Sequence, residues 1–74
     1  MDSTLVWQTA EAPALTALQR EIVRGIVSGR TNAEIAAGLG MTPGMVGTHV
    51  GRIVARLGLD CRADIAPWAA GLWR

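Results

Sequence analysis

The chain has 74 residues, which leaves room for one domain with a modest core and excludes a second catalytic or sensory domain. Half of the residues are hydrophobic, but charged residues and glycines interrupt every apolar stretch, which excludes a membrane span. No export signal is visible at the start of the chain, so we expect a cytoplasmic protein. A single cysteine and a single histidine exclude an internal disulfide and a structural zinc site, and the net charge of +1 does not by itself indicate a nucleic-acid partner.

The start of the chain, residues 1–14, shows no clear hydrophobic period, and we interpret it as an N-terminal arm before a domain at residues 15–74. Trp7 in this arm could dock on the domain or on a second copy, and a frayed terminus is the alternative. The rest of the sequence predicts four helices, so the expected fold class is all-α.

A first helix is predicted after Thr16. Thr16 and Gln19 have the spacing of a capping box, in which each side chain satisfies a free backbone N–H at the helix start. Gly29 is expected to end this helix, since glycine adopts the left-handed backbone conformation at little steric cost. The apolar residues that share one face at helical spacing are Leu18, Ile22, Val23, Ile26 and Val27.

A second, shorter helix repeats these devices. Thr31 and Glu34 form another capping box, and Gly40 is expected to end the helix after about two turns. Its short apolar face consists of Ile35, Ala36 and Leu39.

A third helix is predicted after Thr42, which can cap it, with Pro43 at the first helical position, where a missing N–H costs nothing. Gly58 is expected to end this helix. Its apolar residues form one continuous inward stripe, which consists of Val46, Val50, Ile53, Val54 and Leu57.

A fourth helix is expected to be capped by Asp60 and to run to about Leu72. Pro67 lies inside this segment and removes a backbone hydrogen bond, so we expect a kink or a late start there. A chain of this size is too small to bury every apolar side chain, which favours a homodimer. The predicted dimer interface consists of Ile65, Trp68, Ala69, Leu72 and Trp73.

The second and third helices together have the pattern of a helix-turn-helix: a short capped helix, a glycine turn and a longer amphipathic helix with its own cap. Such a pair can project the outer face of its second helix into the major groove of DNA, although similar pairs occur in proteins that do not bind DNA. No acidic residue lies between Glu34 and Asp60, whereas His49, Arg52 and Arg56 do. One part of the surface can therefore be positive despite the small net charge.

Three blocks of the sequence fall in register with one family pattern: GRTNAEIA at residues 29–36, VGTHV at 46–50 and RLGL at 56–59. On these blocks the chain resembles the DNA-binding domains of the LuxR/GerE family, from about residue 15 to residue 72 without a gap. The resemblance implies a four-helix (tetrahelical) helix-turn-helix domain whose third helix reads the major groove and whose fourth helix forms a two-fold dimer. It also implies a DNA-binding transcription regulator, or an accessory to one, and not an enzyme.

The chain departs from this pattern on the surface of the third helix. Members of the family commonly carry lysine at the positions of Gly44 and Gly47 and threonine at that of Met45. Together with Gly51 these make three glycines inside one predicted helix. Each is expected to lower the stability of the helix by about 1 kcal/mol relative to alanine, so their presence needs an explanation. The predicted outer stripe of this helix is Gly44, Gly47, Thr48, Gly51, Arg52 and Ala55.

Two explanations of this stripe stay open. In the first, the glycines let the helix backbone lie close to DNA, with Thr48 near base edges and Arg52 and Arg56 on phosphates. In the second, the domain is a protein-interaction module that binds another regulator and has lost sequence-specific DNA binding. The groove that would receive a partner helix consists of Gly47, Gly51 and Ala55.

The candidate DNA-contacting residues are Thr31, Asn32, Thr42, Gly44, Met45, Gly47, Thr48, Gly51, Arg52 and Arg56. Asn32 could donate to a phosphate or serve a local turn. Arg62 is expected to pair with a carboxylate within the domain, and His49 is expected to be partly buried. We expect no catalytic residue, no metal site and no cofactor. The expected partners are double-stranded DNA, a second copy of the chain, and RNA polymerase or a larger regulator, with no membrane.

Overall fold

The computed structural model describes residues 15–71, which form four α-helices and one 3₁₀ turn, with no strand in that range. None of these helices is long and apolar enough to cross a membrane. The all-α, four-helix class predicted from the sequence is confirmed. In chain order the elements are α1 (Ala17–Val27), α2 (Asn32–Leu39), α3 (Pro43–Leu57), η2 (Arg62–Asp64) and α4 (Ile65–Ala69).

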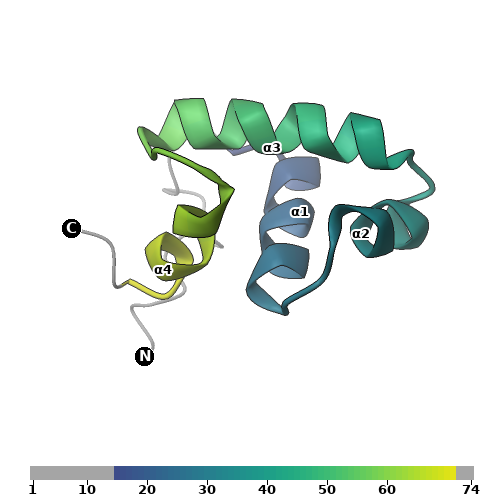
Figure 1. Cartoon of the computed structure of the whole chain (residues 1–74), viewed down its shortest axis with the longest axis horizontal. Helices are drawn as coiled ribbons and strands as arrows, with labels where there is room; N and C mark the ends of the chain where they lie inside the picture. The colour runs from purple at the N-terminus through teal and green to yellow at the C-terminus, as the bar shows by residue number, and fades with distance from the viewer. Residues whose placement is uncertain (1–14, 72–74) are drawn as a thin grey trace.

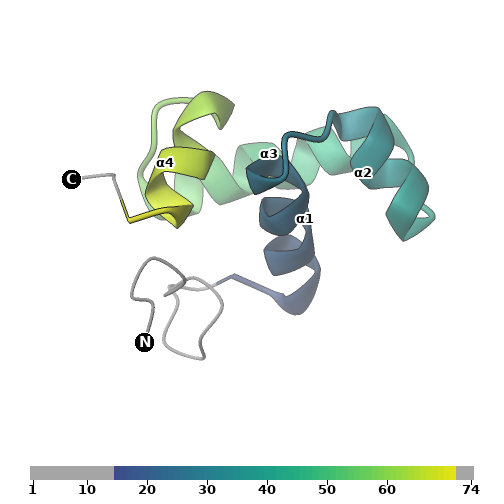
Figure 2. The ribbon, with the colours of Figure 1, turned by 90° about the horizontal axis from the view of Figure 1, so that it is seen from below.

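The long helix α3 lies across one side of the molecule, and the other three helices pack beneath it (Figure 1). α1 lies between α2 and α4, and the view from below in Figure 2 shows the same order in front of α3. Contacts of α1 with α3 and α4, and of α2 with α3, join these elements into one unit. One side of α3 is thereby buried, and its opposite side is left uncovered by the described helices.

The core is made from the inward faces of all four helices. The five apolar residues expected on the inner side of α3 are all buried in this core or packed against it. Val27 is an exception to the stripe predicted on α1: it is the last residue of that helix and is 47% exposed. The buried apolar residues are Leu15, Ile22, Val23, Ile26, Ile35, Ala36, Val46, Val50, Ile53, Leu59, Ile65 and Ala69.

Both predicted capping boxes are present. Thr16 Oγ1 accepts the N–H of Gln19 at 3.0 Å, and Gln19 Oε1 accepts the N–H of Thr16 at 3.3 Å. The second box has the same form, with Thr31 Oγ1 3.1 Å from the N of Glu34 and Glu34 Oε1 2.8 Å from the N of Thr31. The starts of α1 and α2 are therefore fixed by side chains three residues apart, as the sequence predicts.

The turn between α2 and α3 also follows the prediction. Gly40 has a φ of +67°, the left-handed conformation that ends α2 and that glycine adopts without a clash of a β-carbon. Two residues later Thr42 Oγ1 accepts the N–H of Met45 at 3.2 Å, and Pro43 occupies the first position of α3. This turn sets the direction in which α3 leaves α2.

The start of the C-terminal helical segment differs from the prediction. Asp64, and not Asp60, supplies the capping carboxylate: Asp64 Oδ2 accepts the backbone N–H of Asp60 at 3.2 Å and that of Cys61 at 3.3 Å. These bonds stabilise a 3₁₀ turn before the α-helix. The carboxylate that holds this start thus reaches backward along the chain from inside the turn.

The fourth helix is also shorter than expected. It begins at Ile65 and ends at Ala69, whereas the sequence predicts an end near Leu72, a residue outside the described range. The late start expected from Pro67 is confirmed, because Pro67 lies in the first turn, where a helix lacks an internal partner for its N–H groups.

Candidate nucleic-acid interface

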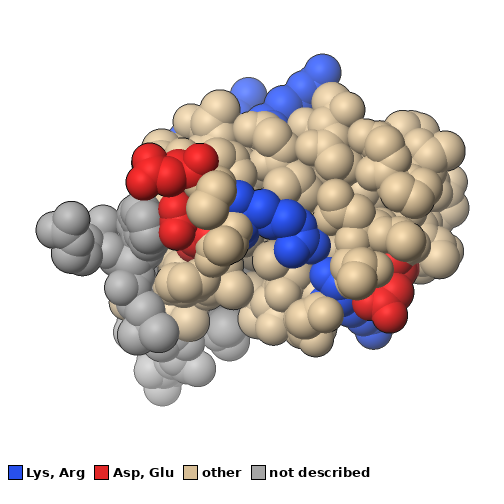
Figure 3. All heavy atoms as spheres, viewed as in Figure 1, with Lys and Arg blue, Asp and Glu red and all other residues tan. Residues whose placement is uncertain are grey.

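We call the outer face of α3 the side turned away from α1, α2 and α4. Figure 3 shows this side as the upper edge of the molecule, where basic side chains stand out from an otherwise uncharged surface. One of its residues, Gly47, is half-exposed and the others are exposed, so the face is open to a partner. The residues of the outer face are Gly44, Gly47, Thr48, Gly51, Arg52 and Ala55.

Nothing inside the domain requires glycine on this outer face. A β-carbon built on Gly51 would meet no atom within 4 Å. On Gly44 it would lie 3.9 Å from Thr42 Oγ1, and on Gly47 it would lie 3.7 Å from Asn32 Nδ2, both ordinary contact distances. The three glycines therefore weaken the helix with no gain in packing.

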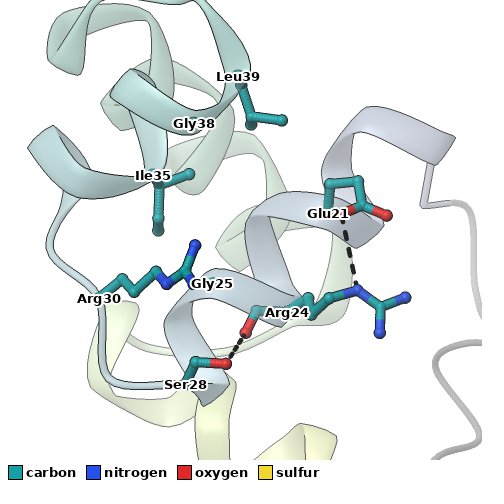
Figure 4. A pocket seen from close by; sticks show the side chains of 8 residues that line it. All are labelled: Glu21, Arg24, Gly25, Ser28, Arg30, Ile35, Gly38 and Leu39. Atoms are coloured by element: carbon teal, nitrogen blue, oxygen red, sulfur yellow. Dashed lines mark hydrogen bonds and ion pairs between the residues drawn. The ribbon is translucent and has the colours of Figure 1, made fainter.

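Gly25, in contrast, is required by packing, because a β-carbon there would lie 2.6 Å from Ile35 Cγ1. A half-open pocket lies beside this contact between α1 and α2, and Figure 4 shows an ion pair at its rim, with Arg24 Nε 3.6 Å from Glu21 Oε1. The pocket contains none of the predicted DNA-contacting residues, so it is separate from the outer face of α3. Its lining consists of Glu21, Arg24, Gly25, Ser28, Arg30, Ile35, Gly38 and Leu39.

Two arginines of α3, Arg52 and Arg56, give the region of the outer face its positive charge. Both are exposed, and α3 itself contains no acidic residue. Within residues 15–71, Arg52 makes no hydrogen bond or ion pair, so its guanidinium donors are available to an anion. A guanidinium matches the geometry of a phosphate, which can accept two of its N–H groups at once.

Three threonines near α3 differ in the hydrogen-bonding capacity that they have left. Thr48 Oγ1 donates to the carbonyl of Gly44 at 3.1 Å, so its oxygen remains as an acceptor. Thr31 and Thr42 accept backbone N–H groups at 3.1 and 3.2 Å, so their hydroxyl protons remain to be donated. Met45, at the start of α3, is 51% exposed. Each of these predicted contact residues can thus be reached by a partner.

The prediction that Arg62 pairs with a carboxylate is wrong for the part of the chain that the structure describes: among residues 15–71 its partners are an amide oxygen and a backbone carbonyl. Its Nε donates to Asn32 Oδ1 at 3.2 Å, and its Nη2 donates to the carbonyl of Arg30 at 3.1 Å. The bond to Asn32 joins residues 30 positions apart in the chain. Hydrophobic period and capping patterns relate residues a few positions apart, so they could not predict the bond between Arg62 and Asn32. The family resemblance includes both residues but does not indicate that they pair.

His49 is half-buried, as expected, and its Nδ1 is buried without a hydrogen-bond partner among residues 15–71. No group of three His, Cys, Asp or Glu side chains in the same range could hold a metal ion. Cys61 is a free, exposed thiol.

The residues predicted for a dimer interface do not form one exposed surface. Ile65 and Ala69 are 0% and 1% exposed, because α4 packs them against α1 in the core of the single chain. Trp68 is half-buried and packs against the same core. Leu72 and Trp73 lie outside the described residues, as does Trp7 of the predicted arm. Of the described members, only Trp68 keeps surface that a second copy could contact.

Comparison with known families gives one match that covers most of the chain. The model of the family described as "GerE: Bacterial regulatory proteins, luxR family" matches residues 13–69. This range includes all four helices and the whole outer face of α3. No solved structure gives a significant match.

Two curated relatives from Mycobacterium tuberculosis match over similar ranges. A probable transcriptional regulatory protein NarL is 42% identical over 52 residues, which is 70% of this chain and 24% of that protein. A putative HTH-type transcriptional regulator is 37% identical over 57 residues, which is 77% of this chain and 6% of that protein. The chain therefore spans a quarter or less of the length of these relatives.

Proposed function

Because the chain belongs to the LuxR family of bacterial regulatory proteins, we propose that it binds double-stranded DNA and regulates transcription, or assists a protein that does. In this proposal the outer face of α3 enters the major groove, which is wide enough to admit a helix. The observation that carries it is the exposure of this face on a helix whose other side is held by the core. The regulatory names of the relatives support the same function.

The proposed contacts fall into two groups. Arg52 and Arg56 bind phosphates, and Thr48 lies near base edges, where its oxygen can accept from a base amino group. The glycines permit the backbone of α3 to approach the DNA closely, so that binding depends on groove shape and charge more than on base identity. The remaining proposed contact residues, around the starts of α2 and α3, are Thr31, Asn32, Thr42 and Met45.

A fluorescence titration with labelled duplex DNA at several salt concentrations tests this proposal. Affinity is expected to fall steeply between about 50 and 200 mM salt, because bound arginines release counterions from the phosphates. Arg52→Ala is expected to reduce the slope of log K against log salt by about 1. The matched control is Arg24→Ala on α1, at the pocket rim, which is expected to leave the slope unchanged.

The alternative function is a protein-interaction module that binds another regulator. It is favoured by the smoothness of the outer face, where a partner helix could pack on Gly47, Gly51 and Ala55. The titration separates the two: a folded chain that binds no duplex at low salt contradicts DNA binding and supports the interaction module.

We also propose that the chain forms a homodimer. Because Ile65 and Ala69 are buried in the single chain, these two residues of the predicted interface are not exposed to a second copy. Trp68 is the described residue on which it rests, together with the predicted contribution of residues 72–73. Analytical ultracentrifugation tests the homodimer, since a monomer at high protein concentration would contradict it.

We further propose that the chain contacts RNA polymerase or a larger regulator, and that it is located in the cytoplasm. Both follow from a function on bacterial DNA.

A further inference from the structure

We infer that Arg62 is a positioning residue for DNA binding that acts through the side-chain amide of Asn32; this inference rests on the proposed function. Arg62 Nε donates to Asn32 Oδ1 at 3.2 Å, and Arg62 Nη2 donates to the carbonyl of Arg30 at 3.1 Å. Two bonds to two different residues hold the guanidinium in one place. In this way η2, which lies just before α4, is tied to the start of α2.

The bond from Arg62 decides which way the Asn32 amide points. A guanidinium can only donate, so the atom of Asn32 that faces it must be the carbonyl oxygen Oδ1. The Nδ2 group is then directed to α3, where a β-carbon on Gly47 would lie 3.7 Å from it. Gly47 has no side chain to cover this group, and Asn32 is only half-buried. A donor is thereby presented beside the outer face of α3.

This orientation matters because a phosphate only accepts hydrogen bonds. With Arg62 in place, Asn32 offers its two N–H donors to a phosphate of DNA seated against α3. Without Arg62 the amide is free to turn over and to present Oδ1, an acceptor that a phosphate repels. Asn32 thus supplies, from the neighbouring helix, a contact to the DNA backbone that Gly47 cannot make because it has no side chain.

The salt dependence of binding distinguishes positioning from direct contact. Asn32 is neutral, so its bond to a phosphate adds affinity without neutralising the phosphate and without releasing a counterion. An arginine that binds a phosphate itself adds about 1 to the salt slope. If Arg62 acts only through Asn32, its removal weakens binding and leaves the slope unchanged.

The test is a double-mutant cycle with Asn32→Ala, Arg62→Ala and the double variant, measured on a fluorescein-labelled duplex of mixed sequence. Each single variant is expected to weaken binding by about threefold to tenfold, with an unchanged slope between about 50 and 200 mM salt. The double variant is expected to bind no more weakly than either single variant, because both remove the same contact. Arg52→Ala is the control for a direct phosphate contact and is expected to lower the slope by about 1.

Four results would overturn the inference. Losses that add in the double variant, or a lower slope for Arg62→Ala, mean that Arg62 acts independently of Asn32. Binding that responds to Arg52→Ala but not to Asn32→Ala or Arg62→Ala removes the role of Asn32 and leaves the proposed function intact. If the unaltered chain binds no duplex, the proposed function fails and this inference fails with it.

A second measurement does not depend on whether the variants fold. Asn32 is the only asparagine of the chain, so its side-chain NH₂ signals can be labelled selectively with ¹⁵N and followed by NMR in the unaltered protein. These signals are expected to shift when the duplex is added, and unchanged signals at saturation would contradict the inference.

Arg62→Gln, which keeps an N–H donor without the charge, is expected to retain more affinity than Arg62→Ala.

Discussion

Gly25 of α1 lies so close to Ile35 of α2 that a β-carbon on Gly25 would be 2.6 Å from Ile35 Cγ1. Both residues are buried, so an added methyl group here would have to displace atoms of the packed interior. Their contact sets the distance between α1 and α2, and both helices pack against α3. The position of the proposed DNA-binding helix therefore depends on the absence of a methyl group in α1.

Gly25→Ala is expected to lower the free energy of unfolding by about 1–3 kcal/mol, because the added methyl overpacks the contact between α1 and α2. Urea unfolding followed by circular dichroism measures this change. Gly38→Ala is the matched control, since an added β-carbon there meets no atom within 4 Å, and it should raise stability by up to about 1 kcal/mol. A Gly25→Ala protein as stable as the parent would contradict the close packing of Gly25 against Ile35.

Gly51→Ala is expected to have opposite effects on stability and on binding. The methyl has open space, so the variant should unfold with a free energy about 1 kcal/mol higher than the parent. The same methyl stands on the outer face of α3 and should weaken duplex binding if the helix backbone approaches DNA closely. Urea unfolding and a titration on the same sample measure the two effects. Unchanged affinity would show that this close approach is not used.

Thr42→Ala is expected to destabilise the protein by about 1 kcal/mol, because the N–H of Met45 at the start of α3 loses its acceptor. Thr42→Ser keeps the hydroxyl and should retain most of the stability. Thermal unfolding of the two variants side by side measures the contribution of the cap. Equal losses in both would mean that the methyl group of Thr42, and not its hydroxyl, is what matters.

Asp64→Ala is expected to cost about 1–2 kcal/mol, because two backbone N–H groups, those of Asp60 and Cys61, lose the carboxylate that accepts them. Asp60→Ala should cost less than about 0.5 kcal/mol, since the described contacts assign no cap to that side chain. Unfolding curves for the pair decide between the capping residue seen in the structure and the one predicted from sequence. The reverse ranking would favour the sequence prediction.

The first three helices could be predicted from sequence because their signals are local. A capping box joins residues three apart, a glycine end is set by one residue's φ, and the inward stripe of α3 follows from helical period alone. Val27 is exposed although it has the spacing of the buried face, because hydrophobic period identifies a face of a helix but not the residue at which packing along that face ends.

The segment after α3 was harder to predict because its structure depends on competing local bonds and on contacts from elsewhere in the chain. Asp60 and Asp64 are both acceptable caps by residue type, and only the geometry of the 3₁₀ turn selects Asp64. Ile65 and Ala69 have the period of an exposed dimer face, but α1 covers them. The bond from Arg62 to Asn32 depends on the packing of the whole domain, which no local pattern predicts.

The central claim, that the outer face of α3 meets DNA, is tested most directly by backbone ¹⁵N–¹H NMR spectra recorded while a duplex is added. We predict that the amide signals of Gly44, Thr48 and Gly51 shift, while those of Gly25 and Gly38 beside the pocket stay in place. Shifts confined to the pocket between α1 and α2, or no shifts at low salt, would contradict the account.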